Sequence, residues 1–201
     1  MNSKVSLVIK LVLLAAIVFL GYKLYSIIQE PIRFEKLKEK RYTAIKQRLE
    51  HIRDAQKVFR TETDAFASNF DQLIAFVDTG KETIIERKDS SFTYYDKTYL
   101  KDMVKDTVVT RVLGFQSVKA SLFGEDFDSD QLRYIPGTED EFVMDAKKIN
   151  VNDMVTPVFE AYAADTVIFA DVYGRYEQFI ENHHKLAVGS LTEPSLSGNW
   201  R

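Results

Sequence analysis

The histidines are the first side chains to consider for metal or acid–base chemistry. His183 and His184 are adjacent, and neighbouring residues on a helix point about 100° apart, so the pair cannot easily chelate one metal from one face. The third histidine, His51, lies far away in the sequence. We therefore expect no histidine metal site and no bound cofactor.

An acidic loop has the start of a calcium-binding pattern. Asp126, Asp128 and Asp130 alternate as the first ligands of a calcium loop do. The pattern then breaks, because Gln131 replaces the sharp-turn glycine and Gly137 replaces the bidentate glutamate. A loose calcium site and a solvated loop both fit these residues, and the solvated loop is the simpler interpretation.

Motifs for nucleophilic catalysis or phosphate binding are missing from the sequence. It contains no cysteine, no G-x-S-x-G and no H-E-x-x-H, and eight glycines leave little material for a nucleotide-binding loop. The carboxylates of residues 139–141 follow a Pro-Gly turn and are typical of solvated surface charge. We predict a non-enzymatic protein without catalytic residues.

Four aromatic side chains lie close together in one short segment: Phe92, Tyr94, Tyr95 and Tyr99. They could form a binding patch, or they could fill a core or brace a loop. The second interpretation is the more usual one, because aromatic side chains dominate buried contacts.

A long apolar stretch at the N-terminus predicts a membrane helix. Residues 5–28 contain no acidic residue, and their two lysines, Lys10 and Lys23, can extend their charges to the interfaces. A bilayer core of about 30 Å needs roughly 20 such residues in a helix. The residues expected to face lipid are Leu11, Leu13, Leu14, Ile17, Phe19 and Leu20.

The same stretch could be a cleaved signal peptide, but residues 21–31 offer no good small-x-small cleavage site. We therefore predict a transmembrane signal-anchor over residues 1–28. The lysines and arginines that follow it favour a cytoplasmic head by the positive-inside rule. The short basic leader before the apolar run is instead typical of a signal-anchor, so we predict a single-pass inner-membrane protein with a periplasmic head.

Charge is distributed unevenly after the anchor. Residues 29–60 hold ten Lys/Arg and five Asp/Glu, whereas residues 61–201 hold fourteen and 25. The basic segment could contact anionic lipid, or its charges could simply pair along a solvated helix. The acidic remainder argues against nucleic acid as a partner, since nucleic-acid binding needs clustered Lys/Arg.

Residues 29–62 predict a long amphipathic stalk helix that holds a head at a set distance from the bilayer. Pro31 predicts a kink or a restart near its beginning. Apolar residues then recur at spacings of three and four, which predicts a helix face that covers either the sheet of the head or a partner's helix. This packing face consists of Tyr42, Ile45, Leu49, Ile52, Ala55 and Phe59.

Residues 63–201 predict an α+β head with a mainly antiparallel sheet and one or two short helices. A short helix is expected over 70–77, opened by a capping box from Ser68 to Asp71 and closed near Gly80. A second helical segment is expected over 175–184. Strands are expected over 82–87, 107–112, 118–122, 157–162, 166–172 and 185–188, with extended segments over 133–135 and 141–147.

The N-terminal half resembles that of type IV pilins and type II secretion pseudopilins. The resemblance implies an amphipathic helix packed on an antiparallel sheet and a function in protein assembly. The cleavable leader glycine of those families and the phenylalanine that follows it are missing. Their intramembrane glutamate is missing too, because residues 5–28 contain no acid. The matching residues are Leu49, Ile52, Arg53, Ala55, Gln56, Phe59, Ala65, Phe66, Ala67, Phe70 and Leu73.

Nearly the whole chain is similar to a group of uncharacterised, membrane-anchored Bacteroidetes proteins. This resemblance supports the architecture and implies no particular activity. It rests on the strings at residues 30–34, 52–56, 69–76, 132–136, 157–161, 188–191 and 198–200.

The sequence therefore predicts a non-enzymatic envelope subunit. It would assemble with itself or with other envelope proteins of a secretion, pilus-like or surface-export system. The alternative is a periplasmic ligand- or cell-wall-binding module that uses the aromatic segment 92–99 or the acidic loop 125–130.

Overall fold

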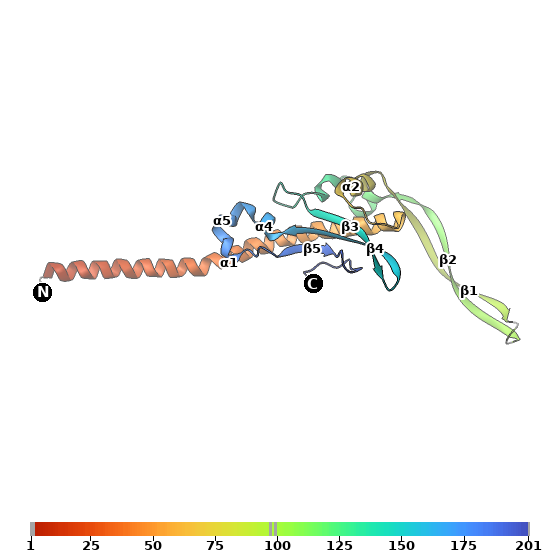
Figure 1. Ribbon diagram of the computed structural model, residues 1–201, viewed down its shortest axis with the longest axis horizontal. Coiled ribbons are helices and arrows are strands. Elements are labelled where there is room, and N and C mark those ends of the chain that lie inside the picture. Colours follow the sequence, from red (N-terminus) through yellow and green to blue (C-terminus); the bar gives the residue numbers. More distant parts are fainter. Residues whose placement is uncertain (1–2, 97, 99, 201) are drawn as a thin grey trace.

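The computed structural model describes residues 3–96, 98 and 100–200. The chain begins with one long helix, α1 (Ser3–Thr63), and continues into an α+β head with antiparallel sheets and short helices (Figure 1). The predicted fold class is therefore confirmed. With 61 residues, α1 is about 90 Å long and runs through both the apolar segment and the head.

The first half of α1 is exposed and apolar. Among the described residues, α1 is the one helix long and apolar enough to span a membrane, and none of its most apolar window is buried. The side chains predicted to face lipid, from Leu11 to Leu20, are all exposed. In water such a surface would be unfavourable, so this segment is compatible with a single-pass membrane anchor.

Pro31 does not interrupt α1. The predicted restart is wrong, because the helix continues unbroken through the proline (Figure 1). A proline inside a helix removes one backbone hydrogen bond to the preceding turn. Phe34, one turn later, is only 2% exposed and packs in the core of the head. The burial of this side chain stabilises the helix beyond the proline.

The second half of α1 is the central helix of the head, which buries the predicted packing face. Ile45, Leu49, Ile52 and Ala55 are fully buried, Phe59 is nearly so, and Tyr42 is half-buried. Buried contacts begin at Phe34, six residues and about 9 Å beyond the end of the apolar segment. From Phe34 onward, the segment predicted to be a stalk therefore lies within the head, which begins directly after the apolar segment.

Helix α2 (Phe70–Thr79) follows α1 and packs back on it. Its N-cap is Asn69, whose side chain accepts a hydrogen bond from the Gln72 backbone N–H, and the Gln72 side chain accepts from the N–H of Ser68. The predicted capping box is thus displaced by one residue. The helix is closed at Gly80 and buries its apolar face, Phe70, Leu73, Ile74 and Val77.

A three-stranded antiparallel sheet lies beside the second half of α1. Its strands are β3 (Val143–Val151), β4 (Met154–Ala164) and β5 (Lys185–Gly189), in the order β3-β4-β5. Asn152 and Asp153 form the two-residue turn between β3 and β4, and both have positive φ. Such a turn matches the twist of the strands and suits Asn and Asp.

The two longest strands form a separate sheet. β1 (Lys81–Asp96) pairs with β2 (Lys101–Ser117) in an antiparallel hairpin that projects from the head, at the end opposite the N-terminus (Figure 1). We call this hairpin the arm. The residue pattern predicts only the segments 82–87 and 107–112 of these strands, because period-two patterning is weak where neither face of a strand is buried.

Two predicted strands are helical instead. Residues 118–122 form α3 (Val118–Leu122), capped by the side chain of Ser117. Residues 166–172 form α4 (Asp165–Ile168) and η2 (Ala170–Val172), which bury the neighbours Ile168 and Phe169 together. In a strand, two adjacent side chains would point to opposite faces.

The predicted helix over 175–184 is also wrong. The chain forms only α5 (Tyr173–Tyr176) and η3 (Glu177–Phe179) before it becomes extended at Ile180. A further short turn, η1 (Ser129–Leu132), precedes an isolated bridge between Tyr134 and Glu141, which joins the two predicted extended segments.

Candidate functional site

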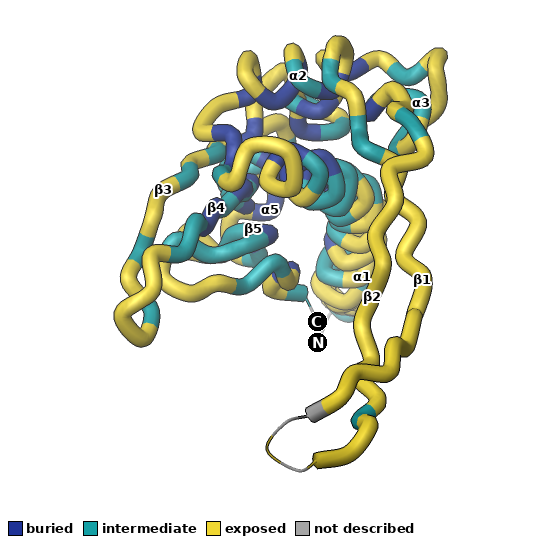
Figure 2. Tube along the Cα trace, turned by 90° about the vertical axis from the view of Figure 1, so that its right-hand side faces the viewer, coloured by how far each residue is buried: buried dark blue, intermediate teal, exposed yellow. Residues whose placement is uncertain are grey.

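The arm is the most exposed part of the head. Both of its strands are exposed along nearly their whole length, whereas buried residues gather between α1, α2 and the sheet (Figure 2). The arm is fastened near its base, where the Thr83 N–H donates to Glu62 and the Ser121 hydroxyl donates to Glu82. A two-stranded hairpin of this kind is marginally stable alone in water.

Both faces of the arm carry apolar side chains. The register pairs Thr93 with Val104 and Asp89 with Val108, so these residues share one face. Phe92 and Tyr94 lie on the other face. The exposed large apolar residues of the arm are Ile84, Ile85, Phe92, Tyr94, Tyr95, Leu100, Val104, Val108, Val109, Val112, Leu113 and Phe115.

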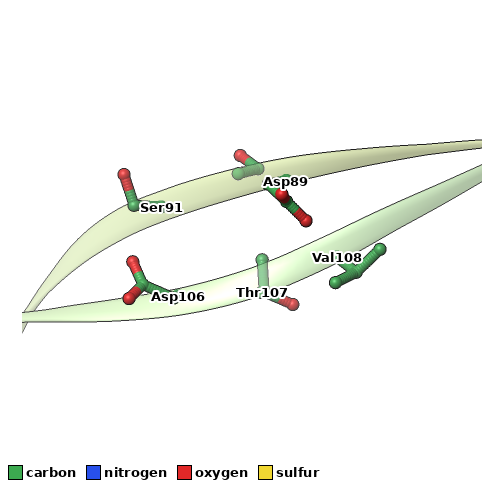
Figure 3. A pocket seen from close by; sticks show the side chains of 6 residues that line it. Asp89, Ser91, Asp106, Thr107 and Val108 are labelled. Carbon is green, nitrogen blue, oxygen red and sulfur yellow. The ribbon is translucent and has the colours of Figure 1, made fainter.

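An open hollow of about 470 Å³ lies midway along the arm. Its lining residues are Asp89, Ser90 and Ser91 of β1 and Asp106, Thr107 and Val108 of β2. Figure 3 shows that these two stretches face each other across the hairpin. Its two carboxylates are exposed to solvent. The hollow is therefore a solvated stretch of the arm's surface.

The aromatic segment lies at the tip of the arm and not in a core. Phe92 and Tyr94 are 48% and 40% exposed, and their ring centroids are 6.2 Å apart. Tyr95 is also exposed, while Tyr99 lies outside the described residues. Of the two interpretations of this segment, core filling is therefore wrong for the three aromatic residues that the structure describes.

A second cluster joins α1 to the remainder of the head. The Tyr42 hydroxyl lies 2.7 Å from both carboxylate oxygens of Asp165, a residue that is only 2% exposed. His184 Nδ1 lies 3.1 Å from Asp165 Oδ2 and 3.2 Å from the Tyr42 oxygen. No local sequence pattern predicts this cluster, because Tyr42 lies more than 100 residues from both of its partners along the chain.

The cluster holds α1 in place. Burial, followed by the hydrogen bond to Asp165, raises the pKa of Tyr42 above its ordinary value, so the phenol remains a donor. Nearby, Arg41 forms a bidentate ion pair with Asp171 at 2.7 Å and donates to the Ile168 carbonyl. Together these contacts fasten one turn of α1 to α4 and η2.

The acidic loop does not gather its carboxylates around a common point. Asp128 caps η1 by accepting from the backbone N–H of Asp130, and Asp126 and Asp130 are exposed. Within the part of the chain that the structure describes, no three His, Cys, Asp or Glu side chains are arranged to hold a metal ion. Likewise, His183 is exposed, while His184 belongs to the Tyr42 cluster.

Comparison with protein-family models, with curated proteins and with solved structures found no match for this chain. The fold and the exposed surfaces therefore define its class on their own. The chain is an α+β protein with one N-terminal helix of membrane-spanning length and a protruding, two-stranded arm.

Proposed function

We propose that this chain is a non-enzymatic, membrane-anchored envelope subunit that assembles with further copies of itself through the arm. The observation that carries the proposal is the exposure of apolar side chains on both faces of β1 and β2. Large exposed apolar surfaces mark sites of interaction, and a bare hairpin gains stability when a partner covers it.

The exposure of two faces favours copies of the same chain over a single different partner. One partner would cover one face, whereas neighbours in a row or ring would cover both. The anchor supports this arrangement, because α1 would give every copy in a bilayer the same orientation. Arms at the far end of the molecule would then lie at equal heights above the membrane (Figure 1).

Charge is also compatible with contacts between arms. Residues 81–117 hold seven Lys/Arg and six Asp/Glu, a net charge of +1. The remaining head residues, 61–80 and 118–201, hold seven Lys/Arg and nineteen Asp/Glu, a net charge of −12. The acidic bodies of neighbouring copies would repel one another, whereas their arms would not.

The proposal includes a pilin- or pseudopilin-like architecture in a secretion, pilus-like or surface-export system. The packing of α1 against an antiparallel sheet supports this likeness. We further propose that the anchor crosses the inner membrane once and that the head is periplasmic. The short basic leader before the apolar segment supports that orientation.

Disulfide crosslinking in intact membranes tests the assembly, because the chain contains no cysteine of its own. The neighbours Ser90 and Ser91 point to opposite faces of the arm. We expect Ser90→Cys and Ser91→Cys to give crosslinked dimers of the full-length chain. Glu125→Cys, an exposed position outside the arm, is the matched control and should remain monomeric.

The crosslinking pattern separates the alternatives. Dimers from both serine positions would support the proposal that copies of the chain cover both faces of the arm. If the chain instead crosslinks to a different envelope protein and forms no dimers, it assembles with other subunits and not with itself. Monomers at both positions would overturn the assembly function itself.

A second candidate function is ligand or cell-wall binding at the tip of the arm. The observation that favours it is the exposed pair Phe92 and Tyr94, since aromatic faces can stack on sugar rings. Thermal unfolding with added peptidoglycan fragments tests it. A specific ligand would raise the Tm of the wild-type chain but not that of a Phe92→Ala, Tyr94→Ala variant.

A further inference from the structure

A polar hollow lies where the head meets the apolar segment of α1. Its volume is about 300 Å³, and α5 contributes Arg175 to its lining. In Figure 1, α5 lies beside α1 on the side of the head nearest the N-terminal half of the helix. Arg175 of the head therefore lies next to the surface of α1 near residues 22–33. The rest of the lining comes from α1: Tyr22, Tyr25, Ser26, Gln29, Glu30 and Arg33.

The position of the hollow along α1 corresponds to lipid headgroups. The apolar segment ends at residue 28, and the hollow extends from Tyr22 to Arg33 across that end. Tyrosines are enriched at the membrane–water interface because the ring is apolar and the hydroxyl is polar. With α1 in a bilayer, this hollow would open at the depth of the phosphate groups.

The charges of the hollow favour an anion. Neither Arg33 nor Arg175 forms an ion pair with any residue that the structure describes, while Glu30 adds one negative charge, which leaves the lining with a net charge of +1. Guanidinium groups match the geometry of phosphate oxygens. Ser26, Gln29 and the tyrosine hydroxyls provide neutral hydrogen-bond donors.

Arg175 is held on a rigid support. Its guanidinium carbon lies 5.2 Å from the ring centroid of Tyr176, which is 6% exposed. Tyr176 in turn packs on Phe34 of α1, with ring centroids 5.3 Å apart. The position of Arg175 beside α1 is therefore set by the core of the head, which reduces the entropy lost on binding.

We propose that this hollow binds the phosphate of an anionic phospholipid headgroup. It would thereby fix the depth and tilt of the head on the membrane. This inference rests on the anchor function of α1 proposed above, and it adds a lipid class and named residues to that function.

Native mass spectrometry of the full-length chain in detergent tests the proposal. The probes are phosphatidylglycerol, phosphatidylcholine and inorganic phosphate, each added at the same concentration. We expect the wild type to retain phosphatidylglycerol in preference to phosphatidylcholine. Arg33→Gln and Arg175→Gln should each weaken that retention by about fivefold, the effect expected for one basic residue at an anionic surface.

Lys36→Gln is the matched control for the two arginine variants. Lys36 is an exposed cation three residues after Arg33 on the same helix, but it does not line the hollow. Its replacement removes the same charge from the same region of the chain and should leave the retention of phosphatidylglycerol nearly unchanged. Equal losses for Lys36→Gln and Arg175→Gln would show a diffuse basic surface and overturn the site.

The remaining outcomes are also decisive. Equal retention of both lipids by the wild type, or unchanged retention in both arginine variants, would overturn the proposal. Displacement of phosphatidylglycerol by inorganic phosphate would assign the hollow to a free anion instead of a lipid. Extraction of membranes with alkaline carbonate tests the anchor separately. Release of the chain would contradict the membrane anchor itself. Retention of the chain in the membrane without a preference for phosphatidylglycerol would contradict only the lipid site.

Discussion

The side chain of Gln56 pairs with both backbone polar groups of Ala67. Its amide nitrogen donates to the Ala67 carbonyl at 2.9 Å, and its amide oxygen accepts from the Ala67 N–H at 2.9 Å. Both residues are fully buried. The pair fastens the chain after α1 to the helix itself and gives two buried backbone groups the partners that burial requires.

Gln56→Met should destabilise the head strongly. Methionine has a similar length but cannot pair with Ala67, so two buried backbone groups lose their partners, at an expected cost of about 3 kcal/mol. Urea unfolding in detergent, followed by the fluorescence of the single tryptophan, Trp200, measures the loss. Gln47→Met, exposed on the same helix, is the control. Equal stabilities of the two variants would contradict the role of Gln56.

Tyr42→Phe should loosen the attachment of α1 to α4. The variant removes the hydroxyl that donates to the buried Asp165, and hydrogen bonds to charged groups contribute about 2 kcal/mol. The same unfolding measurement applies. Tyr134→Phe is the matched control, because Tyr134 is 45% exposed. A Tyr42→Phe variant as stable as this control would show that the hydroxyl is dispensable.

His51 should make the head less stable in acid. Burial, followed by the charge of Arg48, lowers the pKa of His51, and its Nδ1 is buried without a hydrogen-bond partner among the described residues. Below the ordinary histidine pKa of about 6.5, the unfolded chain therefore binds a proton more readily than the folded chain, so stability falls as the pH falls from about 7 to about 5.

The variant His51→Leu tests this pH dependence. It should flatten the decline in unfolding free energy over the same pH range relative to the wild type. Gln47→Leu, at an exposed position of the same helix that does not titrate, should retain the slope of the wild type. If His51→Leu and the wild type decline in parallel, protonation of His51 does not contribute.

Val108→Asp should impair assembly without unfolding the head. Val108 is 54% exposed on the arm, so its replacement should change the free energy of unfolding by at most about 1 kcal/mol, including the repulsion from Asp89 on the opposite strand. The charge should nevertheless reduce crosslinking in the Ser91→Cys background. Val143→Asp is the control, because Val143 is 51% exposed on β3, outside the arm. Undiminished crosslinking in Val108→Asp would argue against this face as a contact.

Local sequence patterns predict the elements whose structure depends on residues close by in the chain. The apolar run of residues 5–28 predicts a membrane-length helix, and the three-and-four spacing from Tyr42 to Phe59 predicts the helix face that the structure buries. The capping sequence before Phe70 likewise predicts α2, with its cap displaced by one residue. These patterns depend on periodicity and on hydrogen bonds within one or two turns.

Tertiary structure decided the features that depend on distant residues. The segment 166–172 is rich in β-branched and aromatic residues, yet it is helical, because this places Ile168 and Phe169 together in the core. The Tyr42–Asp165 contact spans 123 residues, and the hollow beside Arg33 needs Arg175 from the far end of the chain.

The sequence alone determined a membrane-length helix and an α+β head, since both follow from local hydrophobic patterns. Only the folded chain determined that the head lies beside the apolar segment and that both strands of the arm are exposed along nearly their whole length. The physical reason is that packing between distant segments sets which surfaces are covered.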